Sequence, residues 1–510
     1  NYAGFLRELT GNASVKDLVI GSSDGVHYDG SSIIRHSASA NNYTWYYAGA
    51  ISKVSGSSTV SGVTNFATVE IAADASSKTR TGGITGNWNS TGTLKGCTNY
   101  GTVRNLASQT GQASSTDATS NSSLLGGVLG FFDVCASIEN CTNHGAVLTT
   151  NPGVSAIGGV VGYDGRGSTV KDCTNTGSVA QQSKSILADT AVGGIIAYAK
   201  GASGAFGSVQ GCSNSGAVTA AGNGYIIRVG GVVGYADYYL VTDAVNGGKI
   251  SYSNPAATTN YIAIAGISGH TYHGCVVSSC SNSGTISSDK PQVNRIGGIV
   301  GTLNSSSVRN CTNSGQVSLD NSSSVLANWE SAGGIVGFAE GDSGTREITD
   351  CVNEGYVSLV SNSTGRNTPG RVTAGGIVGM PFTAFSVIAN VNRGRVTVQN
   401  KHASAPYAWA GGIFGMDNGS SAAASVNSNV NYGTVACVSG RSGYSGAGGV
   451  AGNLALASSL QGNCNFGDVE GTVAGAVAGV NSCTFTATVC DALAVNGTTY
   501  GAARRGSSTP

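Results

Sequence analysis

The chain has 510 residues, of which only 10% are charged, while 79 are glycine and 7 are proline. Its 26 acidic and 26 basic side chains cancel, and apolar residues make up 40% of the sequence. These values exclude a highly charged, disordered chain and are not typical of a soluble cytoplasmic enzyme. We therefore expect a folded protein with a long, thin apolar core.

Neither nucleic acid nor the interior of a lipid bilayer is an expected partner. The Lys and Arg residues are scattered and predict no basic face. The most apolar stretch near the end, Val473 to Val480, is much shorter than the roughly 20 residues that span a bilayer, so we expect no membrane-spanning segment. The chain opens at Asn1 without an apolar leader, so we expect any signal or anchor to lie outside this sequence.

Imperfect copies of one repeat follow one another along the chain. Residues 1–80 contain two degenerate copies, which begin with AGFLR at Ala3 and AGAIS at Ala48. From Gly82 onward a pentad related to GGIVG recurs, and a second motif related to CTNSGQV follows most pentads. The spacing between motif Asn residues varies from 31 (Asn282 to Asn313) to 44 (Asn99 to Asn143), which is typical of a solenoid with loops of different length. The pentads begin at Gly82, Gly126, Gly158, Gly193, Gly230, Ala265, Gly297, Gly333, Gly375, Gly411, Gly448 and Gly475.

Both motifs are too short for helices and carry β-branched residues at alternate positions, which predicts strands. The third pentad residue is always Ile or Val, as at Ile84 and Ile299, so we expect it to stack in a core column. The Val or Ile that ends the second motif, such as Val103, predicts another column. We expect one coil per repeat, because 31 residues hold three short strands and their turns but hardly six.

The fold class expected from this pattern is all-β, namely a right-handed parallel β-helix, or solenoid, of about 12–13 coils. We place this β-helix at residues 1–482, with residues 1–80 as degenerate N-terminal coils. Residues 483–510 are expected to form a C-terminal cap and tail.

An Asn-x-Gly tripeptide lies between two strands of each repeat. We expect its Gly to supply a positive φ, which Gly adopts without steric cost. The Asn side chains, from Asn65 to Asn465, are expected to form a hydrogen-bonded ladder between coils. This predicts a structural role for the Asn column rather than a role in ligand binding.

The GG-I/V-V-G pentad followed by N-C-T-N-x-G-x-V resembles the GLUG-type repeats of bacterial, Bacteroidetes-like cell-surface and secreted proteins. The resemblance covers nearly the whole chain. It implies a β-helix and an extracellular or cell-surface location, but no particular activity. Such repeats also occur beside peptidase modules in immunoglobulin-cleaving proteases, yet this chain contains no HExxH metal-binding motif.

Seven of the 13 cysteines share one repeat position, where other repeats place Leu18, Val63, Ala244 or Asn. These apolar replacements favour buried, reduced thiols in the core. Disulfides between stacked neighbours are the alternative, although parallel side chains strain the S–S torsion. No metal site is expected. The seven cysteines are Cys97, Cys141, Cys173, Cys212, Cys280, Cys311 and Cys351.

Aromatic residues follow many pentads, and acidic residues lie one or two positions further on. Such rings can serve one of two roles, of which the first is to close a turn of the core. If they face outward instead, they can pack on the pyranose rings of a sugar, and the neighbouring carboxylates can accept hydrogen bonds from its hydroxyl groups. A glycosidase needs two carboxyl groups about 5 to 10 Å apart across the scissile bond. The acidic residues here follow the pentads at different distances along the sequence, which does not favour such a pair. We therefore predict no catalytic residue. The candidate ligand-binding strip consists of Tyr163, Tyr198, Tyr235, Asp164 and Asp237.

Two classes of function remain. We expect a non-catalytic extracellular scaffold or adhesin whose flank binds glycans or molecules on a host or neighbouring cell. The alternative is a polysaccharide lyase or glycoside hydrolase on a β-helix, which rests on analogy of fold alone. No cofactor is expected in either case.

Overall fold

The computed structural model divides the chain into two compact units, Asn1–Ala256 (unit 1) and Ala257–Pro510 (unit 2). The repeats continue through this boundary, and the sequence did not predict it. The structure describes residues 2–21, 32–36, 45–72, 78–107, 123–184, 186, 189–222, 226–253, 261–288, 295–321, 329–341, 346–362, 371–402, 407–417, 425–439, 445–454, 459–481, 489–490, 494–495, 498–499 and 504–505.

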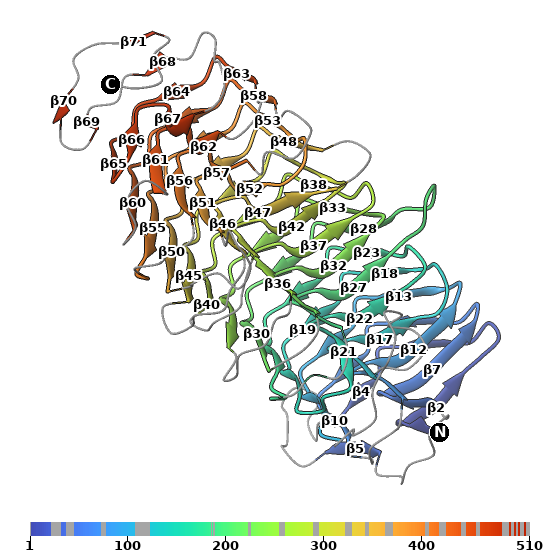
Figure 1. Cartoon of the computed structure of the whole chain (residues 1–510). Coiled ribbons are helices and arrows are strands. Elements are labelled where there is room, and N and C mark those ends of the chain that lie inside the picture. Colours follow the sequence, from blue (N-terminus) through green and yellow to red (C-terminus); the bar gives the residue numbers. More distant parts are fainter. Residues whose placement is uncertain are drawn as a thin grey trace. The chain divides into compact units, whose positions relative to one another are not determined.

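Unit 1 is a parallel β-helix, as the repeat predicts. Each coil contributes one strand to each of five sheets, which we call A to E in chain order. Among the described residues each sheet contains seven strands, which lie side by side in Figure 1. A typical coil consists of β11 (Lys78–Gly82), β12 (Thr85–Ser90), β13 (Thr93–Lys95), β14 (Thr98–Asn99) and β15 (Val103–Asn105).

Unit 2 repeats the same five-sheet architecture. Its described residues give seven strands in sheets A and B, six in sheet C and eight in sheets D and E. A typical coil consists of β46 (Trp329–Gly333), β47 (Val336–Glu340), β48 (Glu347–Thr349), β49 (Val352–Asn353) and β50 (Val357–Ser361). No helix occurs in the described parts of either unit, and none is therefore available to cross a bilayer.

Sheets D and E of unit 2 end differently from the rest of the solenoid. In sheet D, β68 (Val489–Cys490) pairs antiparallel with β71 (Arg504–Arg505). In sheet E, β69 (Ala494–Val495) pairs antiparallel with β70 (Thr498–Thr499). These four strands belong to the predicted C-terminal cap at 483–510, and the remainder of that segment lies outside the described residues.

One repeat forms one coil, as predicted. Asn99 pairs with Asn143 of the next repeat, and Thr98 pairs with Thr142. Each coil nevertheless has five short strands rather than the expected three. The second motif bends at Asn-x-Gly and so contributes strands to both sheets D and E, and the residues before it form sheet C.

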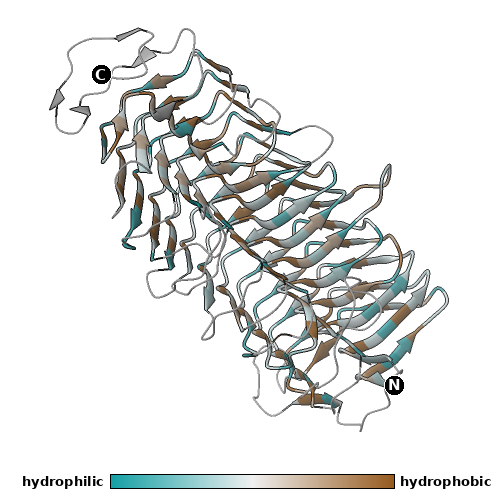
Figure 2. Ribbon diagram, viewed as in Figure 1, coloured by the Kyte–Doolittle hydropathy of each residue, from teal (hydrophilic) through white to brown (hydrophobic). Residues whose placement is uncertain are grey.

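The two predicted core columns are confirmed. The third pentad residues, such as Ile84 and Ile299, are at most 1% exposed, and the residues that end the second motif, such as Val103 and Ile286, have no exposed surface. Apolar segments, brown in Figure 2, recur along the strands of both units. Repetition at fixed positions thus gives each unit a continuous core without any helix.

The Asn ladder is present in both units. In unit 1 the side-chain N–H of Asn65 donates to Oδ1 of Asn99 at 2.9 Å, and Asn99 donates to Asn143 at 2.8 Å. In unit 2 Asn313 donates to Asn353 at 2.9 Å. Each of these amides also donates to the backbone carbonyl two residues later, as Asn99 does to Gly101 at 2.7 Å and Asn65 to Ala67 at 2.9 Å. The ladder therefore satisfies polar groups that the thin core buries.

The expectation of a positive φ at the motif glycine is wrong. Left-handed residues instead lie just before the Cys position, at the turn between sheets C and D, as at Asn140 and Asp172. The motif glycine is required by close stacking, since a Cβ on Gly145 would lie 2.0 Å from the carbonyl oxygen of Gly101. The second pentad glycine is fixed by the ladder, because a Cβ on Gly83 would lie 2.4 Å from the Asn99 side chain.

The seven motif cysteines are buried and free, as predicted. The backbone N–H of Cys97 donates to Sγ of Cys141 at 3.4 Å, and Cys173 repeats this contact with Cys212. In later coils of unit 2 the same position carries a second amide ladder, in which Asn429 donates to Asn463 at 3.0 Å. The position therefore accepts small side chains that bond to the next coil.

Candidate functional site

The three predicted tyrosines lie in one column of sheet B in unit 1. Tyr163 pairs in register with Tyr198, and Tyr198 pairs with Tyr235. Their ring centroids are separated by 4.9 Å and 4.6 Å. The structure therefore brings these three rings together. They belong to β22 (Val161–Asp164), β27 (Ile196–Lys200) and β32 (Val233–Asp237).

Arginines from sheet A cover this column from the side. The guanidinium carbon of Arg228, in β31 (Ile226–Gly230), lies 4.6 Å from the centre of the Tyr235 ring. That of Arg80 lies 3.7 Å from the centre of the Phe131 ring, which begins the column. Such cation–π contacts are stronger when they are shielded from water. The space between sheets A and B is thus occupied by the protein's own side chains, and we call this contact the A–B seam.

The seam leaves little of the tyrosines accessible. Tyr163 is 1% exposed and Tyr235 is 8% exposed, while Tyr198 is half-buried. An inner ring of a stack has neighbours on both faces, so it offers its edge to a ligand rather than a face. The sugar-binding strip stays a prediction, and its accessible part in this structure belongs to Tyr198.

Asp164 lies on the opposite face of its strand from Tyr163, because successive residues of a strand point to opposite faces. Its carboxylate accepts hydrogen bonds from the Tyr239 hydroxyl at 2.7 Å and from the backbone N–H groups of Ser168 (2.6 Å) and Arg166 (2.9 Å). Burial raises the pKa of the Asp164 carboxyl, although these hydrogen bonds oppose the shift. The structure therefore does not place Asp164 beside the tyrosine rings.

The other acids that follow the pentads lie near arginines or in the interior. Asp133 is 3.8 Å from Arg80, and Glu340 forms an ion pair with Arg295 at 2.8 Å. Asp237, the fifth residue of the predicted strip, is buried. In the coils of Asp133 and Glu340, the acidic side chain after the pentad therefore pairs with the guanidinium of an arginine of the same protein.

Sequence reasoning missed the arginines of the seam, although a signal was present. Arg80, Arg228 and Arg295 each lie two residues before a pentad. At this position of sheet A the guanidinium reaches the aromatic column of sheet B, and in unit 2 that of Arg295 lies 3.8 Å from the Phe338 ring. A comparison of positions before the pentad could have identified the ring–arginine contact.

A second surface was not predicted. Two columns of Ser and Thr follow the outer faces of sheets C and D in unit 1, and all nine side chains are half-buried or exposed. Successive members pair in register, so their spacing is about 4.8 Å. We call these residues, together with Tyr100 and His144, the hydroxyl flank. The columns are Thr93, Ser137, Thr169 and Ser208 in sheet C, and Thr64, Thr98, Thr142, Thr174 and Ser213 in sheet D.

An aromatic stack borders the sheet D column at the variable position of Asn-x-Gly. Tyr100 is 45% exposed and lies between Phe66 and His144, with centroid distances of 4.8 Å and 4.6 Å. Nδ1 of His144 is 2.7 Å from the Thr176 hydroxyl. The stack therefore presents ring edges and polar atoms to solvent beside the hydroxyl groups.

No group of three or more His, Cys, Asp or Glu side chains that could hold a metal ion occurs among the residues that the structure describes. In comparisons with known proteins, no family model, no curated protein and no solved structure matches this chain. The case for function therefore rests on the geometry of the two surfaces.

Proposed function

We propose that this chain is a non-catalytic extracellular scaffold or adhesin that binds a glycan or another cell-surface molecule along the hydroxyl flank. The observation that supports this most directly is the in-register spacing of nine hydroxyl-bearing residues in two columns. Ser and Thr hydroxyls both donate and accept hydrogen bonds, as sugar hydroxyls do. Weak contacts that repeat from coil to coil add up when one ligand spans several of them.

The charges beside the flank favour a neutral ligand. Lys95 and Glu139, which lie next to the sheet C column, form an ion pair at 3.4 Å. Lys171 pairs in register with Glu139 on its other side, and Asp172 follows Lys171, so these four charges sum to zero. A neutral polysaccharide fits such a flank better than a polyanion.

Among the described residues, two of the three carboxyl groups with raised pKa values lie in the core, which supports the non-catalytic proposal. The third, Asp189, is half-buried and lies 3.9 Å from the Arg228 guanidinium. Burial raises the pKa of Asp164 and that of Glu330, and neither side chain has any exposed surface. A general acid must lie within hydrogen-bond reach of the group it protonates. Carboxyl groups enclosed in the core do not meet this requirement.

The proposal is tested with a variant that carries Thr98→Val, Thr142→Val and Tyr100→Ala, measured on a glycan array and by adhesion to cells. Removal of two hydroxyls and one ring from the centre of the flank should weaken binding at least tenfold, while the far-UV spectrum and melting temperature stay unchanged. Tyr432→Ala is the matched control, since Tyr432 of unit 2 is 53% exposed and also stacks on a neighbouring ring.

Two results would contradict the proposal. Full binding by the triple variant would exclude the hydroxyl flank, and Tyr198→Ala in the same assay tests the tyrosine strip in its place. Release of oligosaccharides from any polysaccharide on the array by the wild-type protein would instead support the enzymatic alternative.

A further inference from the structure

The hydroxyl column of sheet D has a defined length. Five successive coils of unit 1 place Ser or Thr at the same outward position, and their strands pair in register. Beyond both ends of the column the same position carries a valine, since Val19 pairs with Thr64 and Val245 pairs with Ser213. The sheet D column is therefore a strip of five hydroxyl groups with an apolar residue at each end.

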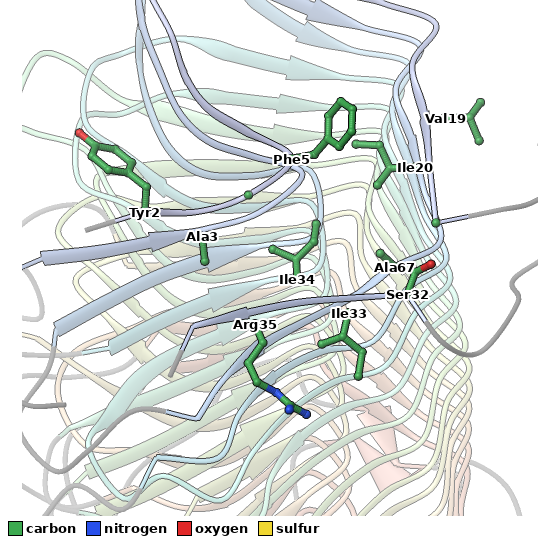
Figure 3. A pocket seen from close by; sticks show the side chains of 12 residues that line it. Tyr2, Ala3, Phe5, Val19, Ile20, Ser32, Ile33, Ile34, Arg35 and Ala67 are labelled. Atoms are coloured by element: carbon green, nitrogen blue, oxygen red, sulfur yellow. The ribbon is translucent and has the colours of Figure 1, made fainter. Parts of the chain in front are cut away.

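Both valines face solvent like the hydroxyl groups beside them. Val19 of β4 (Val19–Ile20) is 43% exposed, and Val245 of β34 (Val245–Asn246) is 45% exposed. Figure 3, which shows the region around β4, has Val19 and Ile20 on opposite sides of this strand. Val and Thr are both β-branched, and a hydroxyl group of Thr takes the place of one methyl group of Val. The strip thus ends because a hydroxyl group is missing, while sheet D itself continues.

Three of the five hydroxyl groups are available to a ligand. Those of Thr64, Thr98 and Thr142 form no hydrogen bond with another residue that the structure describes. At the other end of the strip, the Thr174 hydroxyl lies 3.2 Å from that of Ser213. A free hydroxyl group has one donor and two acceptor positions. The coils of the three free Thr residues should therefore contribute most to the binding of a sugar.

The aromatic stack of the hydroxyl flank follows the same three coils. Its rings lie two residues after the three free Thr residues, at Phe66, Tyr100 and His144. Aromatic rings add apolar surface beside the polar groups of the strip. The stack and the strip also run in the same direction, from one coil to the next. A linear ligand on the strip would therefore have an aromatic border along its length.

The arrangement of outward residues indicates the direction of such a ligand. Within one coil the outward residues differ in chemistry, as the series Thr93, Lys95, Thr98 and Tyr100 shows. Only one of the two residues of β14 points outward, because Asn99 belongs to the buried ladder. Along the solenoid axis the same hydroxyl group returns at every coil, at about 4.8 Å. Identical contacts thus repeat only for a ligand that lies parallel to the axis.

We propose that the sheet D column binds an extended, neutral polysaccharide with equatorial (1→4) linkages, which lies parallel to the solenoid axis and places one sugar residue on each of the five coils. In such a chain each residue advances by one pyranose ring and one bridging oxygen, a distance close to the coil spacing. A chain with an axial linkage curves and leaves the strip. This inference rests on the proposed function, because it specifies the ligand of the hydroxyl flank and its direction.

A chain-length series tests the proposal. The probes are cello-oligosaccharides and chito-oligosaccharides of two to seven residues, which both have equatorial linkages, and malto-oligosaccharides, which contain the same glucose as the first series but have axial linkages. In calorimetric titrations of the full chain, the affinity for at least one equatorial series should rise roughly two- to tenfold with each added residue, the range of one net hydrogen bond. It should level off at five residues. The malto-oligosaccharides should show no such rise.

A gain-of-function variant tests the length of the strip. Val245→Thr adds a sixth hydroxyl group in register with Ser213, so the affinity should level off at six residues instead of five. Val391→Thr in unit 2 is the matched control, since Val391 pairs with valines on both sides, Val352 and Val430. This control should leave the chain-length series unchanged.

A loss-of-function variant tests the continuity of the strip. Thr142→Val removes the middle hydroxyl group, so it should weaken the binding of a five-residue chain at least tenfold and that of a two-residue chain much less. Thr312→Val is the control, because Thr312 occupies the same motif position in unit 2 and is also half-buried. Melting temperatures show whether each variant is folded.

Three results would overturn the proposal: no rise of affinity with chain length in either equatorial series, an equal rise for the malto-oligosaccharides, or a series that still levels off at five residues in Val245→Thr. If the variant with Thr98→Val, Thr142→Val and Tyr100→Ala nevertheless loses a glycan on the array, the proposed function stands and only the axial arrangement is wrong. Full binding by that triple variant would remove both.

Discussion

Glu330 is a charged residue type placed entirely inside unit 2. It has no exposed surface, and its Oε1 accepts a hydrogen bond from the Asn321 side chain at 2.6 Å. Burial raises the pKa of Glu330 to about 7, while the hydrogen bonds from Ser361 and Asn321 oppose the shift. At neutral pH the folded protein therefore holds this carboxyl partly protonated, whereas the unfolded chain ionises it fully.

This difference predicts a pH dependence of stability. The folded pKa is higher than the unfolded value of 4.5, so the contribution to stability is largest below pH 4.5 and is lost as the pH rises from 4.5 to about 7. The loss is on the order of 3 kcal/mol, since one pH unit corresponds to about 1.4 kcal/mol. Glu330→Gln should flatten urea-unfolding free energies over this range relative to wild type. An equal slope in both proteins would show that Glu330 does not titrate abnormally.

Single residues show where sequence reasoning succeeds and where it fails. The Asn ladder was predictable because Asn99 and its equivalents recur at a position where an amide can bond to the coils on both sides. The reason for the motif glycine was not predictable, since the 2.0 Å approach of a Cβ on Gly145 to a neighbouring carbonyl depends on the coil-to-coil distance. Local turn preferences suggested a positive φ, and tertiary packing required a hydrogen atom instead.

At the level of strands, the reactivity of the motif cysteines tests whether the core is closed to solvent. Cys141 and Cys173 are buried. Desolvation holds the pKa of Cys141 above its usual range, and the hydrogen bond with Cys141, together with burial, raises that of Cys173. Thiolates are the reactive form, so thiols with raised pKa values react slowly. The hydrogen bond with Cys141 lowers the pKa of Cys97, so the protection expected for Cys97 rests on its burial.

We predict that alkylation of the native protein, followed by peptide mass spectrometry, labels Cys135 but not the seven motif cysteines. Cys135 is exposed and serves as the internal control. After denaturation all seven motif thiols should become labelled. Native labelling of Cys141 or Cys173 at the rate of Cys135, or failure of the seven to react after denaturation without reductant, would show that the column is accessible or oxidised.

The strand surfaces were only partly predictable. The Thr of the Cys-Thr-Asn motif, as in Thr98 and Thr142, is visible in the sequence, and its outward direction follows from the inward direction of its neighbours. The covering of Tyr235 by Arg228 was not visible, because it depends on how closely sheets A and B approach. Alternation along one strand defines a face, but it does not show which other sheet lies against that face.

At the scale of the whole molecule, we expect a destabilising substitution to unfold the coil that carries it before the other coils. Ile335 lies in the core column of unit 2 and has no exposed surface. Ile335→Asp places an unpaired charge in the core at a cost of several kcal/mol. Because each coil contacts mainly its neighbours, limited proteolysis should cut first near residue 335. Val352→Asp, at a half-buried position of sheet D, is the control and should keep wild-type resistance.

The fold class could be predicted for the whole chain because every repeat specifies the same coil. The division into two units at residue 256 could not, since the pentads and the second motifs continue through it. Repetition determines how one coil stacks on the next.

The direction of the hydrogen bonds between coils has a mechanical consequence. The hydrogen bonds between neighbouring coils run across the strands from one coil to the next, as does the side-chain bond between Asn65 and Asn99, which are 34 residues apart. A force that lifts the first coil away from unit 1 loads the bonds of one coil at a time, as in a zipper. Each such coil then yields at low force and releases roughly 120 Å of extended chain. A solenoid of this kind would lengthen in steps under tension and shorten again as its coils re-form.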